Sequence, residues 1–169
     1  CGFESLRSHH FYQGYRMITK KDLKYIDTAF EIAKATLPVR GSRIGAVLVR
    51  RNRVIGVGFN HYKSHPFQKE YSKNDEAIFF HAEVHAIKNA LSNVTVDDLA
   101  KSTLYIARAK KGTAFKEGKW RYGASRPCTG CASCINEFGI PNVVYTDEDN
   151  KIIEIDNYTK QLIGYSNEG

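Results

Sequence analysis

The sequence predicts an α/β protein in which helices cover both faces of a mixed five-stranded sheet, in a three-layer α-β-α arrangement. Helical and strand-like segments follow one another in the order α-β-β-α-β-α-β-β. The last two strands are separated only by the polar residues 147–150. A parallel pair needs a crossover of about a dozen residues or more, whereas a short polar link suits a hairpin. We therefore expect the last two strands to be antiparallel.

Apolar periodicity and terminal signals place the elements. Leu23, Ile26 and Phe30 recur at helical spacing after Thr19-Lys-Lys-Asp22, which resembles a capping box. The polar segments 60–76 and 110–126 show no clean period, so we expect loops there. By the same reasoning, helices are expected at 20–36, 81–91 and 128–138, and strands at 44–49, 54–59, 103–109, 143–146 and 151–155.

The 169 residues are a length typical of one domain, and no internal repeat or long linker divides them. We expect a single domain over residues 17–169. Residues 1–16 mix aromatic and histidine residues without a period, so they are expected to be an N-terminal extension or an expression remnant. His9 and His10 are expected to be solvated and not metal ligands.

Composition limits the classes of partner and location. No apolar run approaches the roughly 20 residues of a membrane span, and no signal peptide is recognisable, so a cytoplasmic protein is expected. The net charge of +7 favours anionic partners such as nucleotides, phosphate or nucleic acid. Three of the four cysteines fall between positions 128 and 134, a spacing that favours a metal over a disulfide framework.

Two short motifs, each at the start of an expected helix, carry the candidate chemistry. They are His81-Ala-Glu83 and Pro127-Cys128-Thr-Gly-Cys131. A catalytic zinc takes three nitrogen or sulfur ligands and leaves one position for water. His81, Cys128 and Cys131 are the expected ligands, with Zn²⁺ as the cofactor. Glu83 points in another direction from His81, so we expect it to move protons as the catalytic acid and base.

The same residues also allow two other interpretations. A metalloprotease helix requires Glu directly after its first histidine, and Ala82 stands there. His85 is therefore expected to be a supporting or packing residue. Cys134 could complete a closed, purely structural Cys₃His site, but its place on the helix favours a buried apolar role.

In these motifs and in Ile44-Gly45-Ala46-Val47, the chain resembles the cytidine deaminase superfamily, over roughly residues 20–157. Members hydrolyse the exocyclic amine of cytosine, and some act on adenine, guanine or pterin-like rings. The resemblance implies the three-layer α-β-α fold of the superfamily and a zinc-dependent hydrolytic deaminase activity. It also implies assembly into a homo-oligomer, which is frequent in the superfamily.

The resemblance also implies substrate contacts. Asn60, just after the second strand, is expected to contact the sugar, although a turn-forming asparagine is an equal alternative. The backbone near Ala46 is expected to meet the base amide, and Ala82 is expected to contact the substrate. Arg126 beside the metal ligands, and Arg121, could grip a phosphate, or belong with the distal lysines to a solvated basic loop.

Our leading hypothesis is conversion of cytosine to uracil in a free nucleoside or nucleotide: cytidine, deoxycytidine or dCMP. One alternative is a deaminase of single-stranded DNA or RNA, in which basic loops follow phosphates and Trp120 or Tyr122 stack on bases. Another is a zinc-stabilised binding module without catalysis. With histidine as the ligand at position 81, the chain resembles the deoxycytidylate and nucleic-acid-editing branches of the superfamily. Its short final hairpin resembles the free cytidine deaminases instead, so these features do not assign the chain to one branch.

Overall fold

The computed structural model describes residues 17–63, 65–71, 79–112 and 119–155. The expected extension at 1–16 lies outside the described residues. The helices are α2 (Lys20–Ala35), α3 (Pro66–Lys69), α4 (Ala82–Leu91), α5 (Val96–Leu99), α6 (Thr129–Glu137) and the 3₁₀ turn η1 (Glu148–Asn150). The strands are β1 (Ile44–Arg50), β2 (Arg53–Phe59), β3 (Thr103–Lys111), β4 (Trp120–Gly123), β5 (Asn142–Asp147) and β6 (Lys151–Ile155). Across the described part of the chain, no helix combines the length and apolar character that a membrane span needs.

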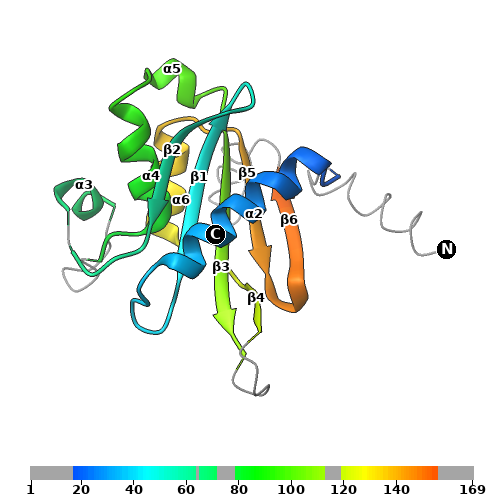
Figure 1. The fold of residues 1–169 in the computed structure, drawn as a ribbon. Coiled ribbons are helices and arrows are strands. Elements are labelled where there is room, and N and C mark those ends of the chain that lie inside the picture. Colours follow the sequence, from blue (N-terminus) through cyan, green and yellow to red (C-terminus); the bar gives the residue numbers. More distant parts are fainter. Residues whose placement is uncertain (1–16, 64, 72–78, 113–118, 156–169) are drawn as a thin grey trace, which may run out of the picture.

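One mixed sheet forms the centre of the molecule, with strand order β2-β1-β3-β5-β6 and β4 added beside β3 (Figure 1). β3 and β5 are parallel, and the other strand pairs are antiparallel. The last pair, β5 and β6, is joined through η1 and is antiparallel, which confirms the prediction from the short link.

Helices cover both faces of the sheet, so the predicted three-layer arrangement is confirmed. α2 packs on one face, where its Ile26 and Ala29 meet Val47 and Tyr105. α4 and α6 pack on the other face around a second core. Residues that alternate along β1 supply both cores, as expected for an interior strand.

The capping box predicted at the start of α2 is present. The Thr19 N–H donates to Oδ2 of Asp22 at 2.8 Å, and the Asp22 N–H donates back to Thr19. Asp22 is buried, and its other oxygen accepts a hydrogen bond from the Tyr105 hydroxyl at 2.7 Å. The helix start is thereby fixed to the central strand β3.

The expectation of five strands and of loops at 60–76 and 110–126 needs correction. β3 continues to Lys111 and turns back into β4, whose short Trp-Arg-Tyr-Gly segment pairs with it residue by residue. α3 interrupts the first supposed loop, because Pro66 pre-sets the first helical turn and His65 caps it. α5 was also missed, although Thr95 and Asp98 form a capping box like the one recognised at Thr19.

β2 is an edge strand, and side chains of α4 form hydrogen bonds with part of its outer backbone. The Asn89 amide donates to the Val57 carbonyl at 2.8 Å, and the Phe59 N–H donates to Nδ1 of His85 at 3.2 Å. The rings of Phe59 and Phe80 contact His85. His85 is thus a packing residue, which agrees with the expectation.

Glycine at position 58 lets α4 lie directly on β2. A Cβ atom there would lie 2.2 Å from the Ala82 carbonyl oxygen and 2.4 Å from the Ala86 nitrogen, both of them backbone atoms. Real Cβ atoms do not approach so closely, so any larger residue must push the helix away. Gly58 therefore sets the distance of the first turn of α4 from the sheet.

We expect Gly58→Ala to lower the free energy of unfolding by about 1–3 kcal/mol, because the added methyl group overpacks the β2–α4 contact. Urea denaturation followed by circular dichroism measures this. Gly123→Ala is the matched control, because its Cβ would meet only flexible Arg108 and Lys110 side chains at 3.0 Å. Equal stability losses in the two variants would contradict the role of Gly58.

Candidate functional site

Two helix starts meet at one place, and each carries an unusual residue at its N-cap. His81 is the N-cap of α4 and Cys128 is the N-cap of α6, and neither side chain makes a capping hydrogen bond. Ser, Thr, Asp and Asn usually occupy this position because their oxygens satisfy the free N–H groups of the first turn. Here the side chains turn toward each other instead of toward their own helices.

Three donor atoms converge between the helices. Nδ1 of His81 lies 3.2 Å from Sγ of Cys131 and 3.6 Å from Sγ of Cys128, and the three donor atoms lie within 4.8 Å of one another. Cys128 and Cys131 come from the first turn of α6 and face the same point. One nitrogen and two sulfurs form a donor set that suits zinc. The three residues are positioned to hold a metal ion.

A hydrogen bond between the two sulfurs shifts their pKa values in opposite directions. A hydrogen bond from the Cys131 side chain, followed by one from His81, lowers the pKa of Cys128 to about 3. The same bond and burial raise the pKa of Cys131. Metal binding requires thiolates, and the start of a helix favours them electrostatically. The exposed Cys128 is therefore suited to bind a metal as a thiolate, and Cys131 lies on the buried side of the three donors.

Glu83 lies beside the three donors but does not belong to their group. Its side chain is only 5% exposed, and Sγ of Cys131 donates to its Oε2 at 3.6 Å. Burial raises the pKa of Glu83 above its usual value. The carboxyl group is thus held at the rim of the donor set, where it can exchange protons with a molecule bound there.

Cys134 lies apart from the donor group. It is fully buried in the core beneath α6, where burial raises its pKa to about 12. A thiol in this state is a packing group, as the sequence indicated. Among the described residues, the metal-binding group comprises His81, Cys128 and Cys131 without it.

The segment that leads into Cys128 is fixed to the carboxyl ends of the parallel strands β3 and β5. The Ser125 N–H donates to the Thr146 carbonyl at 2.9 Å, and its hydroxyl donates to the Ile106 carbonyl at 3.1 Å. This edge of a sheet is where α/β proteins usually place their sites. Sequence reasoning missed Ser125, because a buried serine in a basic segment gives no periodic signal.

Asn60, Ala46 and Ala82 are all buried, and Asn60 lies in the lining of the apolar pocket described below. The Asn60 side chain accepts from the Ile44 N–H at 2.9 Å and donates to the Ser42 carbonyl at 3.0 Å, so it fastens the start of β1. Ala46 and Ala82 are fully buried in the core shared with α4 and α6. Their contact with a substrate stays a prediction.

The cations of the β3–β4 region divide between the two faces of the sheet. Trp120 lies between the cationic groups of Arg43 and Lys111, at 5.4 and 5.8 Å from its ring, and Tyr122 packs edge-on against Phe30 of α2. Because side chains alternate along a strand, Arg121 points to the face of the sheet opposite α2, where it is exposed.

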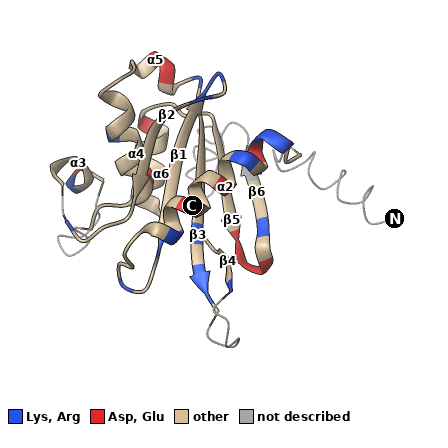
Figure 2. Cartoon of the chain, viewed as in Figure 1, with Lys and Arg blue, Asp and Glu red and all other residues tan. Residues whose placement is uncertain are grey.

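Lys and Arg cluster at this end of β3 and β4 (Figure 2). Arg126 is exposed, and it lies two residues before Cys128. In the described part of the chain, neither Arg126 nor Arg121 has a carboxylate partner, whereas Lys110 pairs with Glu148 at 2.8 Å. Arg126 and Arg121 are therefore free to meet an anion.

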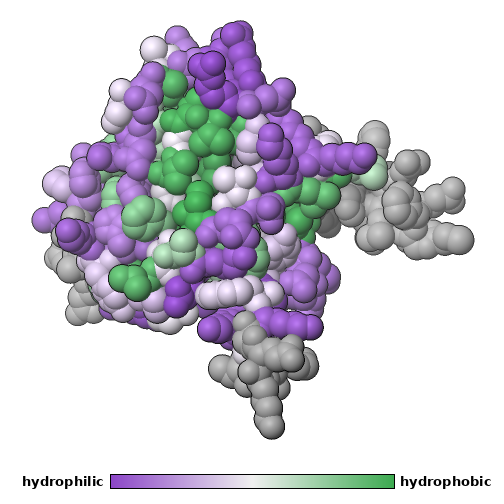
Figure 3. Space-filling view, viewed as in Figure 1, coloured by the Kyte–Doolittle hydropathy of each residue, from purple (hydrophilic) through white to green (hydrophobic). Residues whose placement is uncertain are grey.

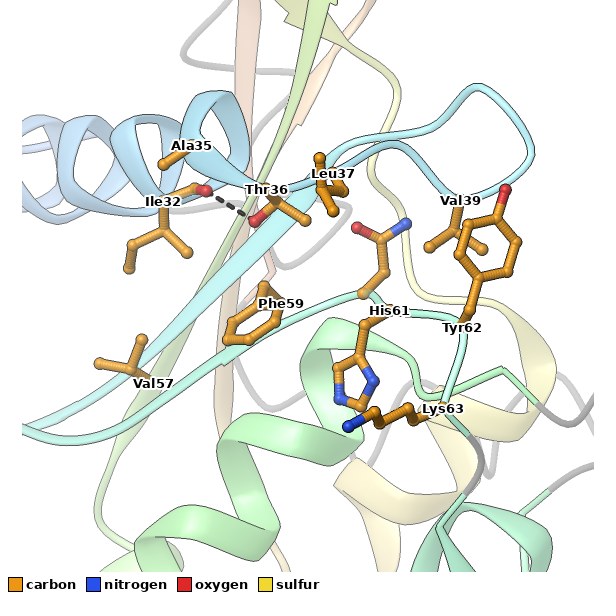
Figure 4. A pocket seen from close by; sticks show the side chains of 11 residues that line it. Ile32, Ala35, Thr36, Leu37, Val39, Val57, Phe59, His61, Tyr62 and Lys63 are labelled. Atoms are coloured by element: carbon orange, nitrogen blue, oxygen red, sulfur yellow. Dashed lines mark hydrogen bonds between the residues drawn. The ribbon is translucent and has the colours of Figure 1, made fainter.

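An apolar pocket of about 750 Å³ opens on the α2 side of β2 (Figure 4). It is lined by residues such as Ile32, Leu37, Val57 and Phe59, with His61 at its lower wall. Apolar side chains also gather over β1 and β2 on this face of the molecule (Figure 3). None of the three donors lines the pocket, so it is separate from the metal-binding group.

The chain matches one protein family in sequence and is similar in structure to several solved proteins. The sequence matches the profile of the cytidine and deoxycytidylate deaminase zinc-binding region over residues 19–147. The apo dCMP deaminase of cyanophage S-TIM5 is similar in structure, with a TM-score of 0.52 and 20% identity over 79% of this chain and 89% of that one. The same enzyme in complex with dCMP and dUMP has a TM-score of 0.53 and 20% sequence identity, over 78% of this chain and 85% of that one. RibD of Acinetobacter baumannii has a TM-score of 0.42 and 26% sequence identity, over 77% of this chain and 29% of that one. No curated protein sequence matches significantly.

We expect the purified protein to carry about one zinc ion per chain, because three donors converge on one point. Cys128→Ser should remove most of the zinc, since a hydroxyl is a far weaker ligand than a thiolate. Mass spectrometry of the metal content measures this. Cys134→Ala, in the same helix, is the matched control and should keep its zinc. Full zinc retention by Cys128→Ser would refute the ligand assignment.

Proposed function

The chain belongs to the cytidine and deoxycytidylate deaminase zinc-binding family, and on that premise we propose that it hydrolyses the exocyclic amine of cytosine in a free nucleotide or nucleoside. The products are uracil, in the same nucleotide or nucleoside, and ammonia. dCMP is the preferred substrate in this proposal, with cytidine and deoxycytidine as the unphosphorylated candidates.

One observation carries the proposal: a buried carboxylate adjoins a group of three metal donors without belonging to it. A structural zinc site has four protein ligands, whereas a catalytic site has three and keeps one position for solvent. The three-donor group here has an exposed member, Cys128, so solvent and substrate can reach it. Glu83 lies next to Cys131 on the buried side.

The chemistry is divided between the metal and the chain. His81, Cys128 and Cys131 would hold the zinc, which would supply hydroxide at neutral pH by lowering the pKa of a water molecule. Glu83 takes the proton from that water and delivers it to N3 of the cytosine ring. After C4 gains the oxygen, Glu83 would move the remaining proton of that new hydroxyl to the amino group, so that the C4–N bond breaks, C4=O forms and ammonia leaves. Burial of Glu83 shields these transfers from bulk solvent.

The remaining candidate residues would position the substrate. Asn60 uses one N–H and one lone pair to fasten β1, and an amide still offers a second of each to a sugar hydroxyl. Ala46 and Ala82 present small side chains, which would leave room for the flat base. Arg126, together with Arg121, would bind the 5′-phosphate through its planar guanidinium group.

The arrangement of aromatic rings favours a free nucleotide over single-stranded DNA or RNA. Stacking of successive bases requires exposed ring faces. Trp120 is flanked by Arg43 and Lys111 and lies on the α2 face of the sheet, away from the donors, and Tyr122 is packed against α2. The proposal includes a homo-oligomer, because deaminases that this chain resembles often form one.

We expect Glu83→Gln to reduce turnover by at least about 10²–10⁴-fold, because the amide cannot carry protons between water and the base. Conversion of dCMP, deoxycytidine and cytidine is followed by the loss of cytosine absorbance. Zinc content and melting temperature, which should stay near wild type, are the controls. Undiminished turnover in this variant would refute the role of Glu83, whereas a wild-type chain that binds zinc but converts no cytosine compound would favour the non-catalytic binding module.

Arg126→Ala should raise KM for dCMP about tenfold or more, because a charged hydrogen bond to phosphate is worth roughly 1.5–3 kcal/mol. KM for deoxycytidine should change little, since it has no phosphate. Steady-state kinetics with both substrates provide the comparison, and Lys101→Ala, at the opposite end of β3, is the matched charge control. Turnover confined to single-stranded oligonucleotides would overturn the free-nucleotide proposal.

A further inference from the structure

The short helix α3 contacts the start of α4, and Tyr71, which follows α3, contacts α6. Gln68 of α3 is buried, with 2% of its surface exposed, and its Oε1 accepts a hydrogen bond from the His81 N–H at 3.0 Å. This N–H lies just outside α4, and no helical carbonyl serves it. The backbone of the residue that carries the imidazole donor is therefore held by a side chain of α3.

Tyr71, just after α3, contacts the other helix start. Its hydroxyl donates to Oε2 of Glu137 at 2.8 Å, which joins it to the last turn of α6. Its carbonyl oxygen lies against the first turn, where a Cβ on Gly130 would come within 2.2 Å. Gly130 lies between Cys128 and Cys131, so Tyr71 bears directly on the turn that carries both sulfurs.

Gln68 and Tyr71 are also connected to each other and to the core. The Tyr71 N–H donates to the Gln68 carbonyl at 3.0 Å, so the two residues form one turn of backbone. His65 caps this turn through the Phe67 N–H at 3.1 Å. Phe67 packs on the rings of Tyr71 and Phe138, which seats the turn on the end of α6.

We propose that Gln68 and Tyr71 form a clamp that sets the distance between His81 and the two cysteines, and thereby the affinity for zinc. Both are positioning residues, since neither belongs to the donor group. The inference rests on the metal role of His81, Cys128 and Cys131 in the proposed function. Residues that orient metal ligands typically alter metal affinity by about 10–100-fold when they are removed.

Gln68→Met is the main test, because methionine has a similar length and keeps the packing but cannot accept the His81 N–H. We expect its zinc dissociation constant to rise about 10–100-fold, measured by competition with a chromophoric chelator. The visible spectrum of the cobalt-substituted protein should change as well, because it reports ligand geometry. Tyr71→Phe should weaken zinc binding in the same direction, and it keeps the proposal testable if Gln68→Met does not fold.

Phe67→Leu is the matched control in the same turn. It removes packing under α3 and keeps both clamp hydrogen bonds, so it should lower the melting temperature while zinc affinity stays within about threefold of wild type. The clamp is overturned if Gln68→Met and Tyr71→Phe bind zinc as tightly as wild type, or if Phe67→Leu weakens zinc binding equally. Failure of the proposed function would look different, because the wild-type chain would bind no zinc or would bind it without turning over any cytosine compound.

Discussion

The contact between the first turns of α4 and α6 is the constraint on which the rest of the site depends. His81 and Cys131 are 50 positions apart in the chain, yet their donor atoms lie 3.2 Å apart. Ligand geometry tolerates errors of only about half an ångström, so each helix must be held firmly. Gly58 fixes the depth of α4 on β2, and Ser125 fixes the segment before α6. Contacts with the sheet thus determine the distances between the donor atoms of the two helices.

The charges at this contact explain why a cation belongs there. A thiolate at Cys128 and the carboxyl group of Glu83 lie close together and partly out of water, which is unfavourable for two anions. The free N–H groups at the start of each helix offset part of that repulsion. A divalent metal offsets the remainder and makes the nearby carboxylate useful as a proton carrier.

The parts that the sequence predicted are those with a local chemical signature. Apolar periodicity located α2, α4 and α6, and the His-x-Glu and Cys-x-x-Cys spacings identified the donors and Glu83. β4 was missed because its four residues pair only through β3, and its flanking lysines look like a loop. Gln68 and Ser125 could not be found from spacing, because their roles depend on backbone groups brought close by the fold. His65-Pro66, however, is a helix-start signal that could have located α3.

The covered outer side of β2 has a consequence for how copies of this chain can associate. A bare edge strand offers its backbone to the edge of another molecule, and such pairing leads to open-ended aggregates. Asn89 and His85 occupy the Val57 carbonyl and the Phe59 N–H, so a foreign strand cannot continue the ladder at these points. Fibril-like growth from this edge is blocked by the same helix that presents the imidazole donor.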